Sequence, residues 1–267
     1  MSAGHVTDDT TRSEVEVGTD RALFVYGVVR AADTRGGAPE LTGLDGAPVG
    51  FVVDGPLAAA VTPVSLDRPP GRRAELLAYQ SVLDVLAEAG PVAPVRFGSV
   101  LADGQSVVEE LLGPRQEGFV AFLDQLDGKR QYNLRATYVE EAVLADLVAT
   151  EPEIRQLRDY TKDLPEHAGY GERARLGELV YHAMQDRSSF DADVLLDAVV
   201  PLAVAHLVRT PPSATQVLDV ALLVEEARAE ALVAALEDLA EAVHERIRMR
   251  LVGPLAAYDF VGEAGWG

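Results

Sequence analysis

Apolar and polar residues alternate with the period of two that is typical of strands in several short segments of the chain. The first of these, residues 21–30 (RALFVYGVVR), predicts a strand with Val25 on one face and Tyr26 and Val28 on the other. Residues 1–20 show no such period, and they lack both the basic start and the apolar core of a signal peptide. We therefore expect them to form a disordered polar tail.

The segments that follow predict a hairpin, a helix, a strand and further helices, in that order. Residues 49–64 contain two apolar runs separated by Asp-Gly-Pro, which is typical of a hairpin turn. Residues 72–90 repeat apolar side chains at helical spacing and end at Gly-Pro. The next strand ends at Gly98, and a capping-box pattern at Ser106 predicts the start of helices that include residues 114–128.

A second series of elements begins after the Asp-Gly pair at the end of these helices. Residues 130–139 alternate polar and apolar side chains and predict a strand. The other predicted elements are two helical regions, two strands, a helix and a strand, at residues 140–150, 172–200, 202–210, 216–225, 225–243 and 245–252.

Both series predict an α+β domain that resembles the ferredoxin-like fold. We expect each sheet to be antiparallel or mixed and covered by helices on one face, with an expanded helical crossover in the second domain. The predicted bounds are a tail at 1–20, the two domains at 21–128 and 129–252, and a C-terminal tail at 253–267. Because aromatic residues are concentrated in that last segment, we expect Tyr258 and Phe260 to dock on the body and tie the domains together, with Trp266 left loose.

Composition narrows the classes of function. The chain has 43 acidic and 23 basic residues, for a formal net charge of −20, and this charge disfavours binding to nucleic acid. No apolar run reaches the roughly 18 residues of a membrane span, so we expect no membrane partner. The absence of cysteine excludes disulfides and thiolate chemistry and fits a cytoplasmic protein.

Few side chains form a pattern that indicates catalysis, and we expect neither a cofactor nor a metal. Glu178, His182 and Asp186 lie four residues apart on one predicted helix face, either as part of a metal site or as a solvated polar face. We favour the polar face, because a closed metal site needs about four ligands. His206 lies in an apolar strand, where a hydrogen-bonded or edge-facing histidine is a better interpretation than a catalytic base.

Arginines alternate with apolar residues in the last predicted strand. Arg246, Arg248 and Arg250 are expected to share one face of it, which is unusual in so acidic a chain. They could pair with carboxylates on neighbouring strands, such as that of Asp219, or they could form a basic patch that contacts an acidic partner.

Four segments, in the same order, resemble motifs of the gas vesicle protein F/L family (GvpF/GvpL). They are the opening strand ALFVYGVV, the segment PVRFGS, the helix RARLGELV and the terminal RLVGPLAAYDFV. The resemblance implies a role for the motif residues Arg96, Phe97, Gly98, Gly177, Tyr258 and Phe260. It also implies a gas-vesicle-associated accessory protein without catalytic activity that binds the hydrophobic shell protein and other accessory proteins.

The motif around Arg96 allows two interpretations. We expect its guanidinium to bond backbone carbonyls or a carboxylate at the strand end while Phe97 packs inward, which is a structural role. The alternative is an arginine that holds a carboxylate of a partner.

For the whole chain the leading hypothesis is a non-enzymatic assembly protein. The alternatives are a regulatory module that binds a small molecule between paired ferredoxin-like domains, and an enzyme that uses Arg96 and His206.

Overall fold

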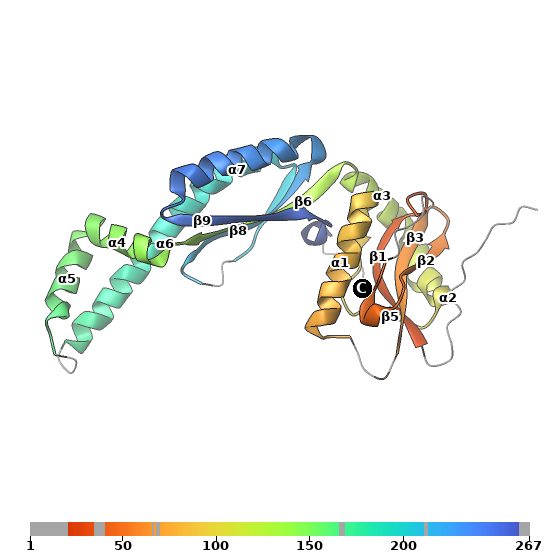
Figure 1. Ribbon diagram of the computed structural model, residues 1–267, viewed down its shortest axis with the longest axis horizontal. Helices are drawn as coiled ribbons and strands as arrows, with labels where there is room; N and C mark the ends of the chain where they lie inside the picture. The colour runs from red at the N-terminus through yellow and green to blue at the C-terminus, as the bar shows by residue number, and fades with distance from the viewer. Residues whose placement is uncertain are drawn as a thin grey trace, which may run out of the picture. The chain divides into compact units, whose positions relative to one another are not determined.

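The chain forms two compact units, each built around one antiparallel sheet. The computed structural model describes residues 21–34, 41–65, 67, 70–165, 169–210 and 213–261 (Figure 1). One unit comprises Met1–Gly128 together with Ala256–Gly267, and the other comprises Lys129–Leu255. The chain therefore passes between the units twice, after Gly128 and after Leu255.

The first unit has a sheet in the order β2-β3-β1-β4, with β5 also paired to β1. Its elements are β1 (Arg21–Arg30), the 3₁₀ turn η1 (Leu44–Gly46), β2 (Gly50–Asp54), β3 (Leu57–Ser65), α1 (Arg73–Ala89), β4 (Val92–Pro94), β5 (Val100–Leu101), α2 (Gly104–Ser106), the π-helix η2 (Val107–Leu112), the 3₁₀ turn η3 (Gly113–Arg115) and α3 (Gln116–Leu126). All of its strand pairs are antiparallel.

Strand β1 is buried on both faces, and a bulge changes which residues share a face. The pairing with β3 shifts between Val25 and Gly27, so that Tyr26 is an extra residue in the ladder. The bulge reverses the alternation that follows. Val28 consequently packs in the same cluster as Val25, while Val29 joins Tyr26 in the other cluster. The predicted placement of Val28 beside Tyr26 was wrong for this reason.

Helices cover both faces of the first sheet. Helix α1 packs in the cluster of Tyr26, whereas η2 and α3 pack in the cluster of Val25 (Figure 1). The predicted single covered face is therefore corrected for this unit, since a central strand that is apolar on both sides must be buried on both sides.

The helical region after β5 begins earlier than the capping-box pattern predicted. Asp103 is the N-cap of α2, and its Oδ1 accepts a hydrogen bond of 2.8 Å from the backbone N–H of Ser106. Ser106 therefore lies inside the first turn, because the carboxylate of Asp103 takes the capping role that was predicted for Ser106.

An aromatic cluster joins distant segments of the first unit. The ring of Tyr79 lies 5.3 Å from that of Phe97 and 6.3 Å from that of Tyr258, and it also contacts Phe24 and Tyr26. The Tyr79 hydroxyl donates to the carbonyl of residue 95. The C-terminal segment thus docks on α1 through Tyr258, whereas Trp266 lies outside the described residues.

The second unit has a sheet in the order β7-β8-β6-β9, and all of its strand pairs are antiparallel. Its elements are β6 (Lys129–Tyr138), α4 (Glu140–Thr150), α5 (Pro152–Lys162), α6 (Tyr170–Val199), the 3₁₀ turn η4 (Val200–Leu202), β7 (Ala205–Val208), β8 (Gln216–Glu225), the 3₁₀ turn η5 (Glu226–Arg228), α7 (Ala229–Val243) and β9 (Ile247–Leu255); the 3₁₀ turn η6 (Tyr258–Phe260) follows in the first unit. Strand β9 extends beyond the predicted end of the last strand at residue 252.

This sequence of strands and helices, with the first and third strands in the centre, confirms the ferredoxin-like prediction for the second unit. Helices α4 to α6 form the expanded crossover. The first unit has the same strand order, but the described residues between its first two strands form only the 3₁₀ turn η1 and no crossover helix.

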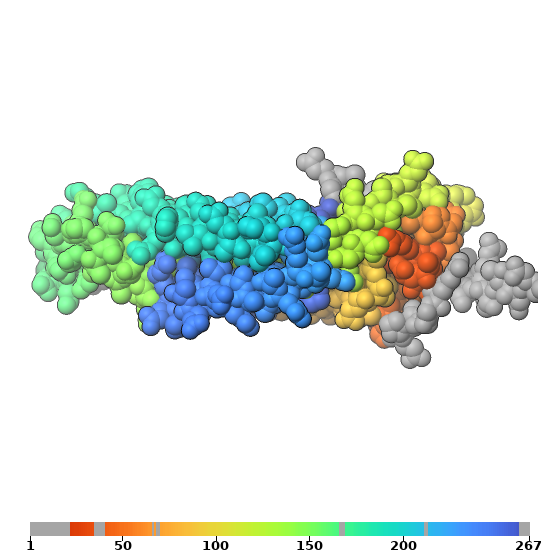
Figure 2. All heavy atoms as spheres, turned by 90° about the horizontal axis from the view of Figure 1, so that it is seen from above, coloured from red at the N-terminus to blue at the C-terminus, as the bar shows by residue number. Residues whose placement is uncertain are grey.

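One core fills the second unit, between the sheet and its helices. The inward residues of β6 and β8, among them Leu134 and Val220, pack against α4 to α7. Helices α6 and α7 lie next to each other over this face of the sheet (Figures 1 and 2). Within the core, Asp191 on α6 accepts hydrogen bonds from the Tyr138 hydroxyl at 2.6 Å and from Arg246. The other face of the sheet carries polar side chains on β6 and mainly apolar ones on β7 and β8.

The aromatic cluster predicts that Tyr258 stabilises the first unit. Tyr258→Ala should lower the free energy of unfolding by about 2 kcal/mol, because the half-buried ring loses its contact with Tyr79. Urea unfolding measures the change. Tyr170→Ala is the control, since that ring is 84% exposed. Equal stability of the two variants would contradict the docking role of the C-terminal segment.

Candidate interaction surface on the second sheet

The face of the second sheet opposite its helices carries a row of charged side chains that runs from β9 across β6 and β8 to the residue after β7. Arg135 on β6 lies directly opposite Asp219 on β8 and, on its other side, directly opposite Arg250 on β9. Arg209 follows β7, and its backbone N–H donates to the carbonyl of Asp219 at 2.8 Å. We call these four residues the arginine row.

The pleat of β6 explains why polar residues gather on this face. Tyr132, Leu134, Ala136 and Tyr138 point into the core, and the residues between them must therefore point the other way. Asp219 is the acidic residue within the otherwise apolar interior of β8, and it faces the same side as Arg135.

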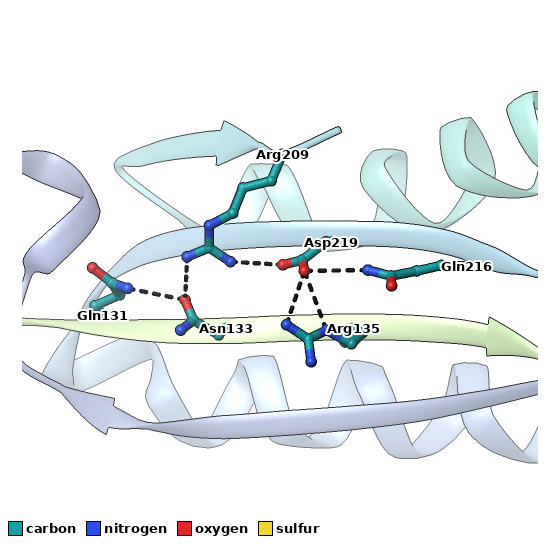
Figure 3. A network of polar contacts seen from close by, with 6 residues as sticks. All are labelled: Gln131, Asn133, Arg135, Arg209, Gln216 and Asp219. Carbon is teal, nitrogen blue, oxygen red and sulfur yellow. Dashed lines mark hydrogen bonds and ion pairs between the residues drawn. The ribbon is translucent and has the colours of Figure 1, made fainter. Parts of the chain in front are cut away.

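The carboxylate of Asp219 is the centre of a hydrogen-bond network (Figure 3). Its Oδ2 accepts from Nε and Nη2 of Arg135 at 3.1 and 3.0 Å, and its Oδ1 accepts from Nη1 of Arg209 at 2.6 Å. Gln216 donates to Oδ2 at 3.2 Å. Asn133 joins the network by accepting from Nη2 of Arg209 at 3.2 Å. Both carboxylate oxygens are therefore occupied by protein donors.

The same contacts decide the ionisation of Asp219. Desolvation of the buried side chain opposes the charged form, but hydrogen bonds and charge from Arg209 and Arg135 outweigh it, and the pKa of the carboxyl lies below its usual value. Asp219 is thus a fixed negative charge that two guanidinium groups share.

Two arginines beside the network lack such a partner. Arg248 and Arg250 are exposed on β9, and neither makes a hydrogen bond or an ion pair through its side chain with any residue that the structure describes. Since Arg250 faces Arg135 across the ladder, two like charges lie directly opposite each other. This edge of the sheet is locally basic in a chain of net charge −20.

Arg246 does not belong to this surface, which corrects the prediction of three arginines on one face. Its backbone N–H donates to the carbonyl of Val243 at 2.9 Å in the turn before β9, so the strand alternation starts only at Ile247. The side chain of Arg246 therefore reaches Asp191 in the core. The suggested pairing of these arginines with Asp219 was also wrong, because Arg135 and Arg209 occupy that carboxylate.

The opposite edge of the sheet is apolar. Strand β7 pairs only with β8 among the described residues, and Leu207 and Val208 are 44% and 50% exposed. Val204, just before the strand, is 46% exposed. His206 is exposed on the same edge strand, which fits the edge-facing interpretation. An exposed apolar edge strand is a typical contact for another polypeptide.

The motif residues of the first unit have divided roles. Phe97 packs in the aromatic cluster, and Gly98 adopts a φ of 95°, which favours glycine. Arg96 is exposed, and its side chain has no hydrogen bond or ion pair within the described residues. The expected bonding of Arg96 to carbonyls or a carboxylate was therefore wrong. The packed Phe97 and the turn hold the arginine toward solvent.

The candidate metal ligands remain separate from any site. Glu178, His182 and Asp186 are all exposed on α6, and no group of three or more metal-ligating side chains forms in the described part of the chain.

Gly177 is exposed next to them, and an added Cβ there would meet no other atom. Phe260 is partly buried in η6. Among the helices that the structure describes, none is long and apolar enough to cross a membrane.

Sequence reasoning missed Arg135, Arg209 and Asn133 as members of a polar network. The available signal was the polar set at every second position of β6 together with a single aspartate in the apolar β8. The directly bonded pair Arg135 and Asp219 lies 84 positions apart in the sequence, so only the pairing of strands could show that these residues meet.

Removing the Asp219 charge should destabilise the second unit. Asp219→Asn is expected to cost about 1–3 kcal/mol at neutral pH, because the partly buried Arg209 and the more exposed Arg135 lose their shared, buried anion. Since the pKa of Asp219 is lowered, its contribution is present above the ordinary value of about 3.9 and is lost as pH falls through the lowered value. Urea unfolding from neutral pH to pH 3 should therefore show a smaller difference between the two proteins at acid pH, and a constant difference would contradict this role.

Arg96→Ala should leave stability unchanged to within about 0.5 kcal/mol, since the exposed guanidinium bonds no described residue. Phe97→Ala is the matched comparison in the same turn and should cost about 2 kcal/mol through lost packing in the aromatic cluster. Thermal unfolding measures both changes. Equal losses in the two variants would restore the structural role of Arg96.

Comparison with known proteins identifies the family. The family model described as "Gas vesicle synthesis protein GvpL/GvpF" matches residues 22–262. Gas vesicle protein F of Streptomyces sp. (strain CB03234) is 35% identical over 246 residues, which cover 90% of this chain and 99% of that protein. Gas vesicle protein L1 of Halobacterium salinarum is 24% identical over 97% of this chain and 96% of its own length.

Solved structures agree with the fold. The crystal structure of GvpF from Anabaena sp. PCC7120 superposes with a TM-score of 0.76 at 22% sequence identity and covers 90% of this chain and 98% of its own. GvpF from Microcystis aeruginosa gives a TM-score of 0.70 at 21% identity, with the same coverage. The family model extends over both units and all four motif segments, and the chain belongs to the GvpL/GvpF family of gas vesicle synthesis proteins.

Proposed function

We propose that this chain serves gas vesicle formation as a non-enzymatic, cytoplasmic accessory protein that binds the hydrophobic shell protein and other accessory proteins. Its family supports the role in vesicle formation. The binding of the shell protein rests on one observation, the exposed apolar edge of the second sheet at β7.

The β7 edge offers two kinds of contact to an apolar partner. The side chains of Val204, Leu207 and Val208 present apolar surface, whose burial is worth about 25 cal/mol per Å². The backbone groups on the unpaired side of the strand can hydrogen-bond an added strand. A partner segment that covers this edge gains both, and its own apolar surface is removed from water.

The charge of the chain suits such a partner. With a net charge of −20, copies of this protein repel one another, and a complex with an apolar subunit inherits that repulsion. The protein would in this way suppress self-association of the subunit until assembly. Because the contact is apolar, it should persist when salt screens the charges.

The polar network supports a binding role in preference to a catalytic one. The donors of Arg135 and Arg209 are aimed at the oxygens of Asp219, so these groups saturate one another. Arginine keeps its proton at every ordinary pH, and Asp219 has a lowered pKa, so neither transfers a proton readily near neutral pH.

The test is co-expression of this protein with a gas vesicle shell protein, followed by pull-down. Leu207→Asp should reduce the recovered shell protein about tenfold, since it places a charge in the apolar contact. Val233→Asp on α7 is the matched control, because Val233 is 41% exposed and lies away from the sheet edge.

The interaction should survive about 1 M salt, where the Debye length is about 3 Å. Vesicle yield in a strain that lacks the gene, complemented with each variant, should follow the pull-down. Full recovery of shell protein by the Leu207→Asp variant would exclude the β7 edge as the contact. Normal vesicles in the strain without the gene would favour the small-molecule-binding module instead.

A further inference from the structure

Strand β9 forms the other edge of the second sheet, and its chemistry is the opposite of that at β7. It pairs only with β6 among the described residues. Met249 and Leu251 pack toward the core, so Arg248, Arg250 and Val252 share the face opposite the helices. All three of these side chains are exposed, and Val252 is 39% exposed.

The charges at this edge lack balance. Arg135 lies opposite Arg250, and the nearest anion in the row, Asp219, already accepts from Arg135 and Arg209. Like charges placed directly opposite one another on a sheet destabilise it. A carboxylate brought beside Arg250 from the open side of β9 would offset that repulsion and gain charge-assisted hydrogen bonds, for which the guanidinium fork is suited.

Protection of the edge does not account for this choice of charge. Charged residues on an edge strand do prevent strands of other molecules from pairing there, but either sign serves that purpose. A glutamate at position 250 would protect the edge and would also pair with Arg135. The chain has 43 acidic residues against 23 basic ones, and yet it places arginine at this position. Arginine at this position favours the binding of an anion from outside the chain.

The spacing of the arginines indicates an extended polypeptide. Residues two apart on a strand are about 6.6–6.8 Å apart along its axis, and carboxylates two apart on a neighbouring strand repeat at the same distance. Next on the same face comes Val252, which can contact an apolar side chain. Polymeric phosphate is a poor ligand, because a chain of net charge −20 repels it at long range.

We infer that the β9 edge, with Arg248 and Arg250, binds an extended acidic segment of a protein partner. That segment carries carboxylates at two alternate positions and an apolar residue at the next. It adds a strand parallel to β9, so that its carboxylates lie beside Arg248 and Arg250 and its apolar residue lies beside Val252. This site is separate from the β7 edge in position and in chemistry. It does not depend on the proposed binding of the shell protein.

A pair of synthetic peptides tests the inference. One has the sequence Thr-Glu-Thr-Glu-Thr-Val-Thr with blocked ends, and the other has glutamine in place of both glutamates. Titration of the full chain, followed by the amide signals of its NMR spectrum, should show the glutamate peptide perturbing β9 and binding at least about tenfold more tightly than the glutamine peptide.

Two double variants separate a specific site from general charge. Arg248→Gln with Arg250→Gln should weaken binding of the glutamate peptide about tenfold or more. Arg158→Gln with Arg175→Gln removes the same charge from exposed arginines of α5 and α6 and should change binding less than about twofold. The β9 double variant should still recover the shell protein in the pull-down, so that failure of one proposal is distinguishable from failure of the other.

Three results would overturn the inference. These are equal binding of the two peptides, equal loss in the two double variants, and perturbation of β7 signals in place of those of β9. Binding of single-stranded DNA as tightly as the glutamate peptide would overturn the choice of an acidic polypeptide.

Discussion

The pleat of strand β6 is the constraint on which the second unit depends. Successive side chains of a strand point to opposite faces of the sheet. Because Leu134 and Ala136 are buried in the core, Asn133 and Arg135 must lie on the opposite face. A slip of one residue would bury an arginine and expose the core. The hydrophobic core and the arginine row are therefore two results of the same register.

Asp219 makes that register compatible with a charged face. Its carboxylate is nearly buried, and it is stable as an ion because Arg209 and Arg135 satisfy it from two neighbouring strands. Asp219 does not neutralise the arginines of β9, because β6 lies between β8 and β9. The sheet consequently has an apolar edge at β7, a neutralised centre and a basic edge at β9. These are three surfaces of different chemistry, and they could serve different partners.

The first unit differs from the second in that its central strand, β1, is apolar on both faces. The bulge after Val25 and the helices on both sides of the sheet bury all of it. The aromatic cluster around Tyr79 then fixes Phe97 and the C-terminal Tyr258 on α1. Because Phe97 packs in the aromatic cluster, the adjoining Arg96 points to solvent. The motif is therefore divided between a packing residue and an exposed arginine.

The sequence by itself determined the class of fold, the order of nearly all elements and the family, since these follow from local period, turn residues and motifs. It failed at details of register, helix capping and strand start. The bulge moved Val28 to the other face, Asp103 replaced Ser106 as the helix cap, and the turn before β9 sent Arg246 to Asp191. Only the tertiary structure decided which charges are neutralised. An ion pair depends on which strands are neighbours, and the sequence does not specify that Asp219 meets Arg135 and Arg209 while Arg248 and Arg250 are left without an anion.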